Sequence, residues 1–351
     1  MRVVVTGAAG FIGSHVVDEL VSAGHDVVAL DGLLPQAHPS GQWPVDRAPG
    51  VPHVVADLRD ADALAVALRG ADAVVHQAAL VGHGLDLADL PSYAGANDLG
   101  TAQLLAMMYR LGITRLVLAS SMVVYGEGRY GCAAHGLVEP PNRQVADLAR
   151  GRFDPRCPVC EQFVAWQPVP ESAPLRPTSV YAASKLAQEN LVTAWCRGTG
   201  AAVVALRYHN AYGPRMPHNS PYSGVAALFR SRVAEGLAPL VFEDGRQMRD
   251  FVHVRDIARA NRLALELPGS LPVGLHPVNI CSGSPRSVGW AASVLASEAA
   301  APAPLVTGEY RAADVRHVVA SPERARSLLA FEAAIAPEAG FSAFAHEPSW
   351  E

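Results

Sequence analysis

Residues 2–13 read Arg2-Val3-Val4-Val5-Thr6-Gly7-Ala8-Ala9-Gly10-Phe11-Ile12-Gly13, and they predict how the first strand and helix of the chain are joined. The β-branched run predicts a strand over residues 2–5, and the amphipathic pattern after the glycines predicts a helix to about residue 22. Gly7 permits a tight turn, Gly10 lets the backbone approach a pyrophosphate, and Gly13 lets the helix pack closely on the sheet. Strand, glycine turn and helix in this order predict a dinucleotide site.

An acidic residue after the second predicted strand supports this interpretation. The strand covers residues 26–30 and ends at Asp31. An acid roughly 20 residues beyond the glycines can accept hydrogen bonds from the adenosine ribose hydroxyls, and it repels a 2′-phosphate. The pattern therefore favours NAD over NADP. The glycine spacing is Gly-x-x-Gly-x-x-Gly rather than the commoner Gly-x-Gly-x-x-Gly. A turn that binds no ligand is the alternative interpretation.

Strands and helices alternate along the first half of the chain. Further strands are expected over residues 54–58, 73–76 and 115–119, with a helix over about 97–105 between the last two. This alternation predicts an α/β fold of the Rossmann type, with a doubly wound parallel sheet. In such sheets ligands bind beyond the carboxyl ends of the strands, where Ser120 and Ser121 fall. His76 ends a buried strand, and we expect it to be a core residue without a catalytic role.

The rest of the chain divides into a return to this sheet and a smaller α/β substrate domain. A helix over 179–195, a strand over 202–206 and a helix over 256–266 return to the sheet. We expect an NAD-binding domain over 1–214, with an insert at 127–174 and its sheet completed by 250–267. Residues 215–249 and 268–351 are expected to form the nucleotide-sugar domain.

Composition excludes several function classes. The 351 residues are 50% hydrophobic and carry a formal net charge of -5 without a basic run, which argues against nucleic acid and anionic membranes as partners. A glycine turn interrupts the apolar start after five residues, so no secretory or membrane segment is built there. We expect a soluble cytoplasmic protein. Five cysteines, an odd number, argue against a disulfide framework.

The stretch Ser179-Val-Tyr-Ala-Ala-Ser-Lys-Leu-Ala-Gln-Glu189 carries the predicted chemistry. Tyr181 and Lys185 are four residues apart on a helix and share one face. An ammonium near a phenol favours the phenolate and should lower the tyrosine pKa from its ordinary value of about 10. That would make Tyr181 a usable base. The same spacing is also common on helix surfaces, but the glycine turn and the Ser120-Ser121 pair favour catalysis.

The assembled motifs resemble the extended short-chain dehydrogenase/reductase family of nucleotide-sugar epimerases and dehydratases. The resemblance covers nearly the whole chain and rests on the following segments: 6–13, 57–58, 77–79, 97–101, 120–126, Tyr181/Lys185, 207–215, 249–254 and 311–316. It implies a tightly bound NAD that contacts these residues: Gly7, Gly10, Phe11, Ile12, Gly13, Asp31, Asp57, Leu58, Gln77, Ala78, Ala79, Asn97, Ser120, Tyr181, Lys185 and Tyr208.

The resemblance also implies catalytic and substrate-binding roles. Ser121, Tyr181 and Lys185 would be catalytic: the serine would bind the reacting sugar hydroxyl, the tyrosine would be the base and acid, and the lysine would hold the nicotinamide ribose. The nucleotide-diphosphate sugar would contact Ser121, Met122, Val123, Tyr181, Asn210, Arg249, Arg311 and Asp314. The two arginines suit a diphosphate because guanidinium groups offer forks of donors to phosphate oxygens. Solvated surface arginines are the alternative.

Met122 and Val123 favour one reaction within the family. The resemblance implies that dehydratases carry acidic groups just after the serine, because loss of water across C5 and C6 needs additional acid/base groups. Their absence here predicts 4-epimerisation through a transient 4-keto sugar. Residues 219–229 are similar to bacterial dTDP-L-rhamnose 4-epimerases, which makes that sugar nucleotide the first expectation. UDP-glucose or UDP-glucuronate is the alternative substrate. A net 4-ketoreductase and a non-enzymatic NAD-binding sensor remain open, and the resemblance implies a homodimer.

The insert contains Cys132-Ala-Ala-His135 and Cys157-Pro-Val-Cys160. Two pairs with this spacing are typical of the halves of a tetrahedral zinc site. All four ligand positions are filled by protein, so the zinc would be structural and would shape a wall of the substrate cleft or a subunit contact. Free thiols with a surface histidine, or a disulfide, are the alternatives.

Overall fold

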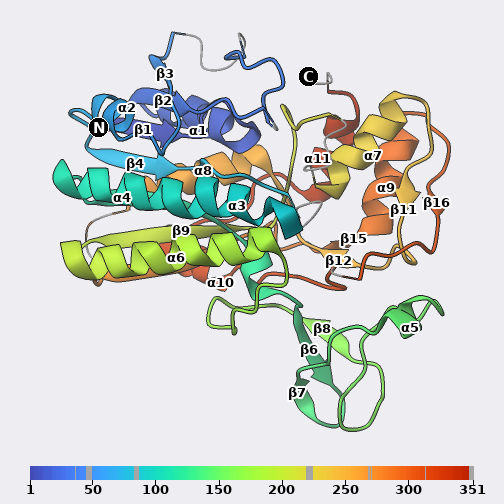
Figure 1. Cartoon of the computed structure of the whole chain (residues 1–351). Coiled ribbons are helices and arrows are strands. Elements are labelled where there is room, and N and C mark those ends of the chain that lie inside the picture. Colours follow the sequence, from blue (N-terminus) through green and yellow to red (C-terminus); the bar gives the residue numbers. More distant parts are fainter. Residues whose placement is uncertain are drawn as a thin grey trace.

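The computed structural model describes residues 1–35, 37–44, 50–82, 87–218, 224–267, 269, 271–312 and 314–347. Its centre is a seven-stranded sheet in the order β14-β9-β5-β4-β1-β2-β3 (Figure 1). Every pairing in this sheet is parallel. Its strands are β1 (Arg2–Thr6), β2 (Asp26–Asp31), β3 (His53–Val55), β4 (Ala73–His76), β5 (Arg115–Ser121), β9 (Ala202–Tyr208) and β14 (Gly274–Ile280). The predicted doubly wound parallel sheet is confirmed.

Helices cover both faces of the sheet. Alternate residues of a strand point to opposite faces, so Val3 and Val5 pack with α1 (Phe11–Ser22) and α8 (Val254–Glu266). Val4 packs on the other face, which α2 (Ala61–Ala67), α4 (Gly100–Arg110) and α6 (Val180–Thr199) cover. Burial on both faces explains why these strands are continuous apolar runs. Within the described part of the chain, each helix is too short or too polar to cross a membrane.

A smaller unit stands at one end of the sheet, at the right of Figure 1. Its apolar core is shared by α7 (Val225–Ala234), α9 (Val288–Glu298) and α11 (Pro337–Ala345). Three two-stranded sheets accompany them: β10 (Asn210–Tyr212) with β13 (Phe251–His253), β11 (Leu240–Val241) with β16 (Leu305–Val306), and β12 (Met248–Arg249) with β15 (Arg286–Ser287). Phe11 of α1 packs against this core, which joins the two units beside the glycine turn.

The insert projects from the body below the main sheet, in green in Figure 1. It contains a three-stranded antiparallel sheet of β7 (Gly136–Val138), β6 (Arg129–Cys132) and β8 (Ala165–Gln167), together with α5 (Val145–Leu148). The insert therefore has a small sheet of its own.

The C-terminal boundary predicted from the sequence is wrong in one respect. Residues 268–351 were assigned to the smaller unit, yet β14 pairs with β9 and is the edge strand of the main sheet. The following α10 (Glu323–Leu329) packs through Ala325 and Leu329 into the core beneath that sheet. The reason is that β9 would otherwise be an unpaired edge. The short elements η1 (Leu87–Asp89), α3 (Leu90–Tyr93), η2 (Ala94–Leu99) and η3 (Met122–Tyr125) complete the described structure.

Candidate functional site

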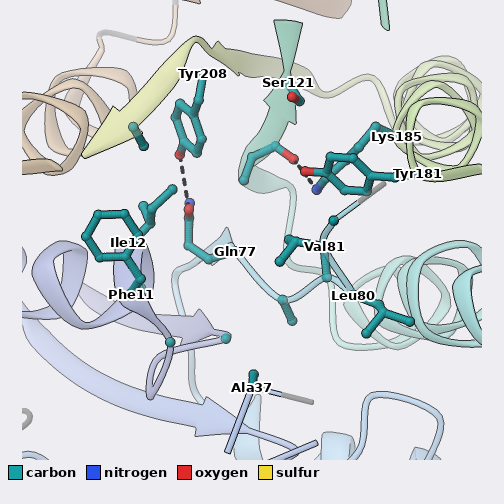
Figure 2. Close-up of a pocket in the computed structure, with 18 of the residues that line it drawn as sticks. Phe11, Ile12, Ala37, Gln77, Leu80, Val81, Ser121, Tyr181, Lys185 and Tyr208 are labelled. Carbon is teal, nitrogen blue, oxygen red and sulfur yellow. Dashed lines mark hydrogen bonds between the residues drawn. The ribbon is translucent and has the colours of Figure 1, made fainter. Parts of the chain in front are cut away.

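A cleft of about 410 Å³ opens at the carboxyl ends of the central strands (Figure 2). Most of the residues predicted for the cofactor and sugar line it: Gly7, Gly10, Phe11, Ile12, Gly13, Asp31, Asp57, Leu58, Gln77, Ala78, Ala79, Ser120, Ser121, Met122, Val123, Tyr181, Lys185, Tyr208 and Asn210. The cleft therefore lies where a doubly wound sheet is expected to bind its ligand.

The glycine turn has no room for side chains at two of its positions. Gly7 adopts a φ of +67°, and a Cβ there would lie 2.6 Å from the backbone nitrogen of Ala78. A Cβ on Gly13 would lie 1.9 Å from the carbonyl oxygen of Gly7. α1 begins at Phe11 after Gly10, and no side chain caps its first N–H groups. These donors and the helix dipole form an anion site, which fits a pyrophosphate.

Replacing Gly13 tests this packing. We expect Gly13→Ala to lose bound nucleotide, because the new methyl group collides with backbone rather than with a flexible side chain and pushes α1 away from the turn. The measurement is the amount of NAD released from the purified, denatured protein. Gly198→Ala in α6 provides the control for the loss of a glycine, because a Cβ there meets no atom within 4 Å and its φ is not positive. A Gly13→Ala protein with a full complement of NAD would contradict the assigned role of the turn.

Asp31 is held rigidly at the wall of the cleft. Its Oδ2 accepts a hydrogen bond from the Ala9 backbone at 3.0 Å, and its Oδ1 accepts one from the Leu33 backbone at 2.8 Å. The Nε2 atom of His38 lies 3.8 Å from Oδ1. A carboxylate has about four acceptor positions, so acceptors remain for ribose hydroxyls. His38 also lines the cleft, and no sequence signal marked it.

Ser121, Tyr181 and Lys185 gather at one side of the cleft, as Figure 2 shows; we call them the Ser/Tyr/Lys trio. Ser121 ends β5, while the other two lie in the first turns of α6. The hydroxyl of Ser179 begins that helix by accepting a hydrogen bond from the Ala182 backbone at 3.1 Å. The predicted sharing of one helix face by tyrosine and lysine therefore turns both towards the end of β5.

The prediction that the protein's own groups lower the pKa of Tyr181 is wrong. Burial raises the pKa of Tyr181 well above its ordinary value, although a hydrogen bond with Ser121 opposes the rise. Burial also lowers the pKa of Lys185 to about 7, against the attraction of Glu189. The lysine Nζ donates a hydrogen bond to the Ala119 carbonyl at 2.9 Å. Desolvation of both groups outweighs their helical spacing, so the phenol is neutral until further positive charge reaches it.

Asn97 does not line the cleft, contrary to the prediction that it contacts the cofactor. Its Oδ1 accepts a hydrogen bond from the Leu80 backbone at 2.6 Å, and its Nδ2 donates to the Leu80 carbonyl at 3.0 Å. Nδ2 also donates to the Ser184 hydroxyl at 2.8 Å. Asn97 therefore ties the loop after β4 to α6 and positions Leu80, which does line the cleft. Its hydrogen-bonding groups are already used by the protein.

Polar neighbours also fix Gln77. Its Nε2 donates to Asn261 at 2.9 Å, and its Oε1 accepts from the Tyr208 hydroxyl at 3.1 Å (Figure 2). Asn261 lies on α8 and also accepts a hydrogen bond from Tyr208, so Gln77 and Tyr208 are both tied to that helix. His76 behaves as expected of a core residue, because its two ring nitrogens pair with Thr6 and Thr101 and burial lowers its pKa to about 3.

The predicted diphosphate residues lie apart from the described cleft. Arg249 donates from Nη1 to the carbonyl of Arg316 at 2.9 Å and from Nη2 to that of Val315 at 2.7 Å. Arg311 is exposed and stacks over the Phe242 ring at 5.5 Å. Asp314, three residues after Arg311, is half-buried. Arg249, Arg311 and Asp314 thus belong to one wall of the smaller unit, and none of them is among the described residues that line the cleft.

The sequence missed His209, which lies between two predicted site residues. Its side chain is buried and lines the cleft beside Asn210, whose Oδ1 has no hydrogen-bond partner. Burial lowers the pKa of His209 to about 3 despite an opposing contact with Asn279, so the ring is neutral. The available signal was its place directly after Tyr208 at the carboxyl end of β9.

Four side chains of the insert converge in the structure: Cys132, His135, Cys157 and Cys160, which we call the Cys/His tetrad. Their ligand atoms all lie within 4.8 Å of one another. The Cys132 sulfur is 3.5 Å from His135 Nδ1 and 3.7 Å from the Cys160 sulfur, and the Cys157 sulfur is 3.6 Å from the same nitrogen. All the cysteines are free thiols, which excludes the disulfide alternative in this structure.

Known proteins of one family are similar to this chain in sequence and in architecture. The profile of the NAD dependent epimerase/dehydratase family matches residues 3–143 and 162–281. The unmatched residues between these ranges fall inside the insert. A dTDP-L-rhamnose 4-epimerase from Burkholderia thailandensis is 35% identical over 323 residues, which cover 90% of this chain and 86% of that protein.

Solved structures agree with the sequence relatives. UDP-glucose 4-epimerase from Thermotoga maritima, solved with UDP-glucose, is 26% identical with a TM-score of 0.80, and the match covers 98% of this chain and 97% of that one. UDP-glucose 4-epimerase from Thermus thermophilus, solved with NAD, is 30% identical with a TM-score of 0.77, and the match covers 98% of each chain. The chain therefore belongs to the NAD dependent epimerase/dehydratase family, as the motifs predicted.

Proposed function

We propose that this chain is an NAD-dependent nucleotide-sugar 4-epimerase whose preferred substrate is dTDP-L-rhamnose or a related dTDP-6-deoxyhexose. The observation that carries the proposal is the presence of the Ser/Tyr/Lys trio in the same cleft as the glycine turn and Asp31. The similarity to a dTDP-L-rhamnose 4-epimerase supports both the reaction and the substrate.

The cleft fits NAD on grounds of chemistry. Uncapped N–H groups of α1 suit the pyrophosphate, the Asp31 carboxylate suits the adenosine ribose, and Lys185 suits the nicotinamide ribose. When bound, oxidised NAD supplies a hydride acceptor for the sugar carbon and a positively charged ring that favours the tyrosine phenolate. UDP-glucose 4-epimerase from Thermus thermophilus, which is similar in fold, was solved in complex with NAD.

The trio moves the proton. Tyr181 takes the proton of the C4 hydroxyl during oxidation and gives it back during reduction, while Ser121 donates a hydrogen bond that holds the reacting oxygen. Burial lowers the pKa of Lys185 to about 7, so a small increase in local negative charge suffices to keep it protonated. Inversion at C4 requires that the 4-keto sugar present its other face to the same groups. Arg249 and Arg311 would hold the diphosphate while the sugar turns.

Apolar side chains next to Ser121 support both the reaction and the substrate. Met122 and Val123 line the cleft in η3 and offer no proton to expel a C6 hydroxyl, which disfavours dehydration. They also suit the methyl group of a 6-deoxy sugar better than the carboxylate of a hexuronate. Residues 219–223 of the stretch similar to rhamnose epimerases lie outside the described residues, and α7 begins just after them at Val225.

The direct test is turnover without added cofactor. Purified protein is incubated with dTDP-L-rhamnose or UDP-glucose, the product sugar is identified, and nicotinamide absorbance is followed. We expect the C4 epimer of dTDP-L-rhamnose, no net NADH, and NAD as the nucleotide released on denaturation. Preferred turnover of UDP-glucose or UDP-glucuronate would change the substrate only. A requirement for added NAD(P)H would indicate a 4-ketoreductase, and NAD binding without turnover of any nucleotide sugar would indicate a sensor.

We also propose that the Cys/His tetrad binds one structural zinc ion. A tetrahedral site with Zn–S near 2.3 Å and Zn–N near 2.05 Å requires sulfur–sulfur distances of roughly 3.8 Å and sulfur–nitrogen distances of roughly 3.6 Å. The observed 3.7, 3.5 and 3.6 Å match these values. Protein supplies all four ligands, so the site has no open position for catalysis.

Metal analysis tests the zinc proposal. We expect about one zinc per chain in the wild type and a large loss in Cys157→Ser, because a hydroxyl is a poor replacement for a thiolate ligand. Cys196→Ser is the matched control, since this buried thiol lies in the core between α6 and the sheet, away from the tetrad. A wild-type protein with no stoichiometric metal, or equal zinc in the two variants, would contradict the proposal.

We propose in addition that the chain forms a homodimer through α4 and α6. These helices pack side by side on one face of the sheet (Figure 1). Leu99, the last residue of η2 directly before α4, and Tyr109, near the end of α4, have exposed apolar side chains. Light scattering of the purified protein measures the mass: a dimer should dissociate in Tyr109→Glu, whereas a monomeric wild type would end this proposal.

A further inference from the structure

One buried guanidinium joins the insert to the smaller unit. The Arg316 side chain has no exposed surface, and its Nε donates to Asp154 Oδ1 of the insert at 2.7 Å. Its Nη1 donates to Glu243 at 2.8 Å and to Asp244 at 2.7 Å, in the turn between β11 and β12. Its Nη2 donates to Asp244 at 2.9 Å. We call these four residues the Arg316 cluster. Four of the five N–H groups of the guanidinium are used, and their acceptors hold it between two other segments of the chain, at Asp154 and at residues 243–244.

The backbone around Arg316 is held by the insert as well. Glu127 Oε1 accepts hydrogen bonds from the backbone nitrogens of Arg316 at 2.9 Å and His317 at 3.4 Å. The same oxygen accepts from the Tyr130 hydroxyl at 2.6 Å. A Cβ on Gly128 would lie 2.0 Å from the carbonyl oxygen of His317, so the two backbones are in direct contact. The insert and this segment therefore cannot move independently.

A second arginine of the insert repeats the connection. Arg143 donates to Glu243 at 2.6 Å, and both side chains are almost fully buried. It also donates to the carbonyl oxygen of Asp314. Glu243 is thus shared between one arginine from the insert and one from the segment after Asp314. Buried, shared ion pairs of this kind tolerate little displacement, because any broken pair leaves an uncompensated charge.

The segment held in this way orients a proposed diphosphate ligand. Arg249 donates to the carbonyls of Val315 and Arg316, as described above, so its guanidinium rests on the chain that the insert fixes. Arg311 and Asp314 belong to the same segment. All three residues of the smaller unit that were predicted to bind the nucleotide sugar beyond Asn210 are therefore on or against residues 311–316: the arginines for its diphosphate, and Asp314 for one of these arginines or for the nucleoside ribose.

The Cys/His tetrad lies close in sequence to the insert residues that make these contacts. Tyr130 precedes Cys132 on β6, and Asp154 precedes Cys157 by three residues. A metal that joins Cys132 to Cys157 would set the distance between Tyr130 and Asp154. Tyr130 lies on β6, whereas Asp154 lies in an irregular segment between α5 and β8, outside the three-stranded sheet.

We propose that the Cys/His tetrad and the Arg316 cluster position Arg249 for the diphosphate and Asp314 for the nucleoside ribose of the nucleotide sugar, with Asp154 and Arg316 as positioning residues. The inference rests on the proposed function for the identity of the ligand. It assigns a task to the insert: a metal site remote from the cleft sets the affinity for the nucleotide sugar and leaves the NAD site untouched. Ion pairs and backbone hydrogen bonds connect Asp154 through Arg316 to Arg249, and the tetrad acts on this path through the short segment between Asp154 and Cys157.

Asp154→Ala and its conservative counterpart Asp154→Asn test the proposal. The alanine variant removes the acceptor of Arg316 Nε, whereas the asparagine variant keeps an oxygen there. We expect the KM for the nucleotide sugar to rise about tenfold in Asp154→Ala and less in Asp154→Asn, with kcat and bound NAD nearly unchanged. Removal of metal from the folded wild type with a chelator should raise KM in the same direction, and added zinc should restore it.

Glu139→Gln is the matched control. It breaks an ion pair with Arg176 that also involves the insert but is exposed on both sides. We expect its KM to equal that of the wild type, since exposed pairs contribute little. Equal KM values in Asp154→Ala and Glu139→Gln would overturn the positioning role, and so would a parallel loss of kcat and NAD in Asp154→Ala. Should Asp154→Ala fail to fold, Asp154→Asn and the metal-depleted wild type decide the question by the same KM comparison.

Calorimetry with dTDP and UDP separates this proposal from the proposed function. Nucleoside diphosphate binding needs no turnover, so a wild type that binds dTDP without epimerising any sugar would refute the activity alone. Unchanged dTDP affinity in both Asp154→Ala and the metal-depleted protein would refute the positioning role alone. A loss of affinity for both nucleotides in those two samples, with NAD retained, is the result that the proposal requires.

Discussion

Tyr181→Phe should lose turnover by about 10²- to 10⁴-fold and still carry its NAD. The change removes one oxygen, the group proposed to carry the C4 proton, and leaves the ring in place beside Tyr93, whose centroid lies 6.3 Å away. The neighbouring groups are poor replacements for this base: the Ser121 hydroxyl is far less acidic than a phenol, Lys185 donates to Ala119, and burial lowers the pKa of His209 to about 3. The loss should therefore fall on kcat rather than on binding.

The measurement is single-turnover epimerisation together with the nicotinamide content of the same sample. Tyr109→Phe is the matched control, because it loses the same hydroxyl on α4, outside the lining of the cleft, and keeps the apolar ring that the proposed dimer contact uses. It should epimerise at the wild-type rate. Turnover of Tyr181→Phe within a few-fold of the wild type would mean that another group is the base, and a loss of NAD in the variant would mean that the tyrosine is needed for cofactor binding instead.

The features that the sequence predicted well are those set by local geometry. A turn that must accept φ of +67° at Gly7 and contact backbone at Gly13 leaves few choices of residue, so the glycines mark it directly. Strands buried on both faces must be apolar throughout, which makes β1 and β2 visible. Ligand pairs with x2 spacing identified all four members of the Cys/His tetrad before their distances were known.

The features that the sequence did not predict depend on contacts between residues that are distant in sequence. The helical spacing of Tyr181 and Lys185 predicted that they face the same way, but it carries no information on desolvation, which reverses the expected direction of the tyrosine pKa shift. Asn97 was assigned by motif, yet its amide is already paired with Leu80 and Ser184. The place of β14 follows from the open edge of β9, which no property of residues 274–280 reveals.

The Arg316 cluster is a further case of this kind. Charged residues are usually solvated, so a sequence that shows Asp154, Glu243 and Arg316 far apart gives no reason to bury them together. Only the approach of the insert to the smaller unit makes them neighbours. The spacing of the cysteines and the histidine was enough to predict a metal site in the insert. The connection of the insert to Arg249 is visible only in the folded structure.

Glu189→Ala should reduce the free energy of unfolding by about 3–5 kcal/mol. Glu189 and Arg207 are buried, with their side chains 4% and 3% exposed, and they form two hydrogen bonds at 2.9 and 2.7 Å. Glu189 also accepts from the Ser120 hydroxyl at 2.6 Å, which ties α6 to the end of β5. Its removal leaves a buried guanidinium with only the Tyr125 hydroxyl and the Glu171 carbonyl as acceptors. Breaking a buried pair costs more than the pair contributes, because the remaining charge is uncompensated.

Denaturant titration of three variants separates this account from simple loss of packing. Glu323→Gln, which breaks an exposed pair with Arg326, should change the unfolding midpoint little. The double variant Glu189→Leu/Arg207→Leu should recover much of the stability lost by Glu189→Ala, because apolar residues then replace both charges. If the double variant is instead less stable than Glu189→Ala by the full cost of a second core truncation, the charge left behind is not the cause. The hydrogen bonds of Ser120 and Tyr125, rather than the ion pair, would then hold α6 against β5 and β9.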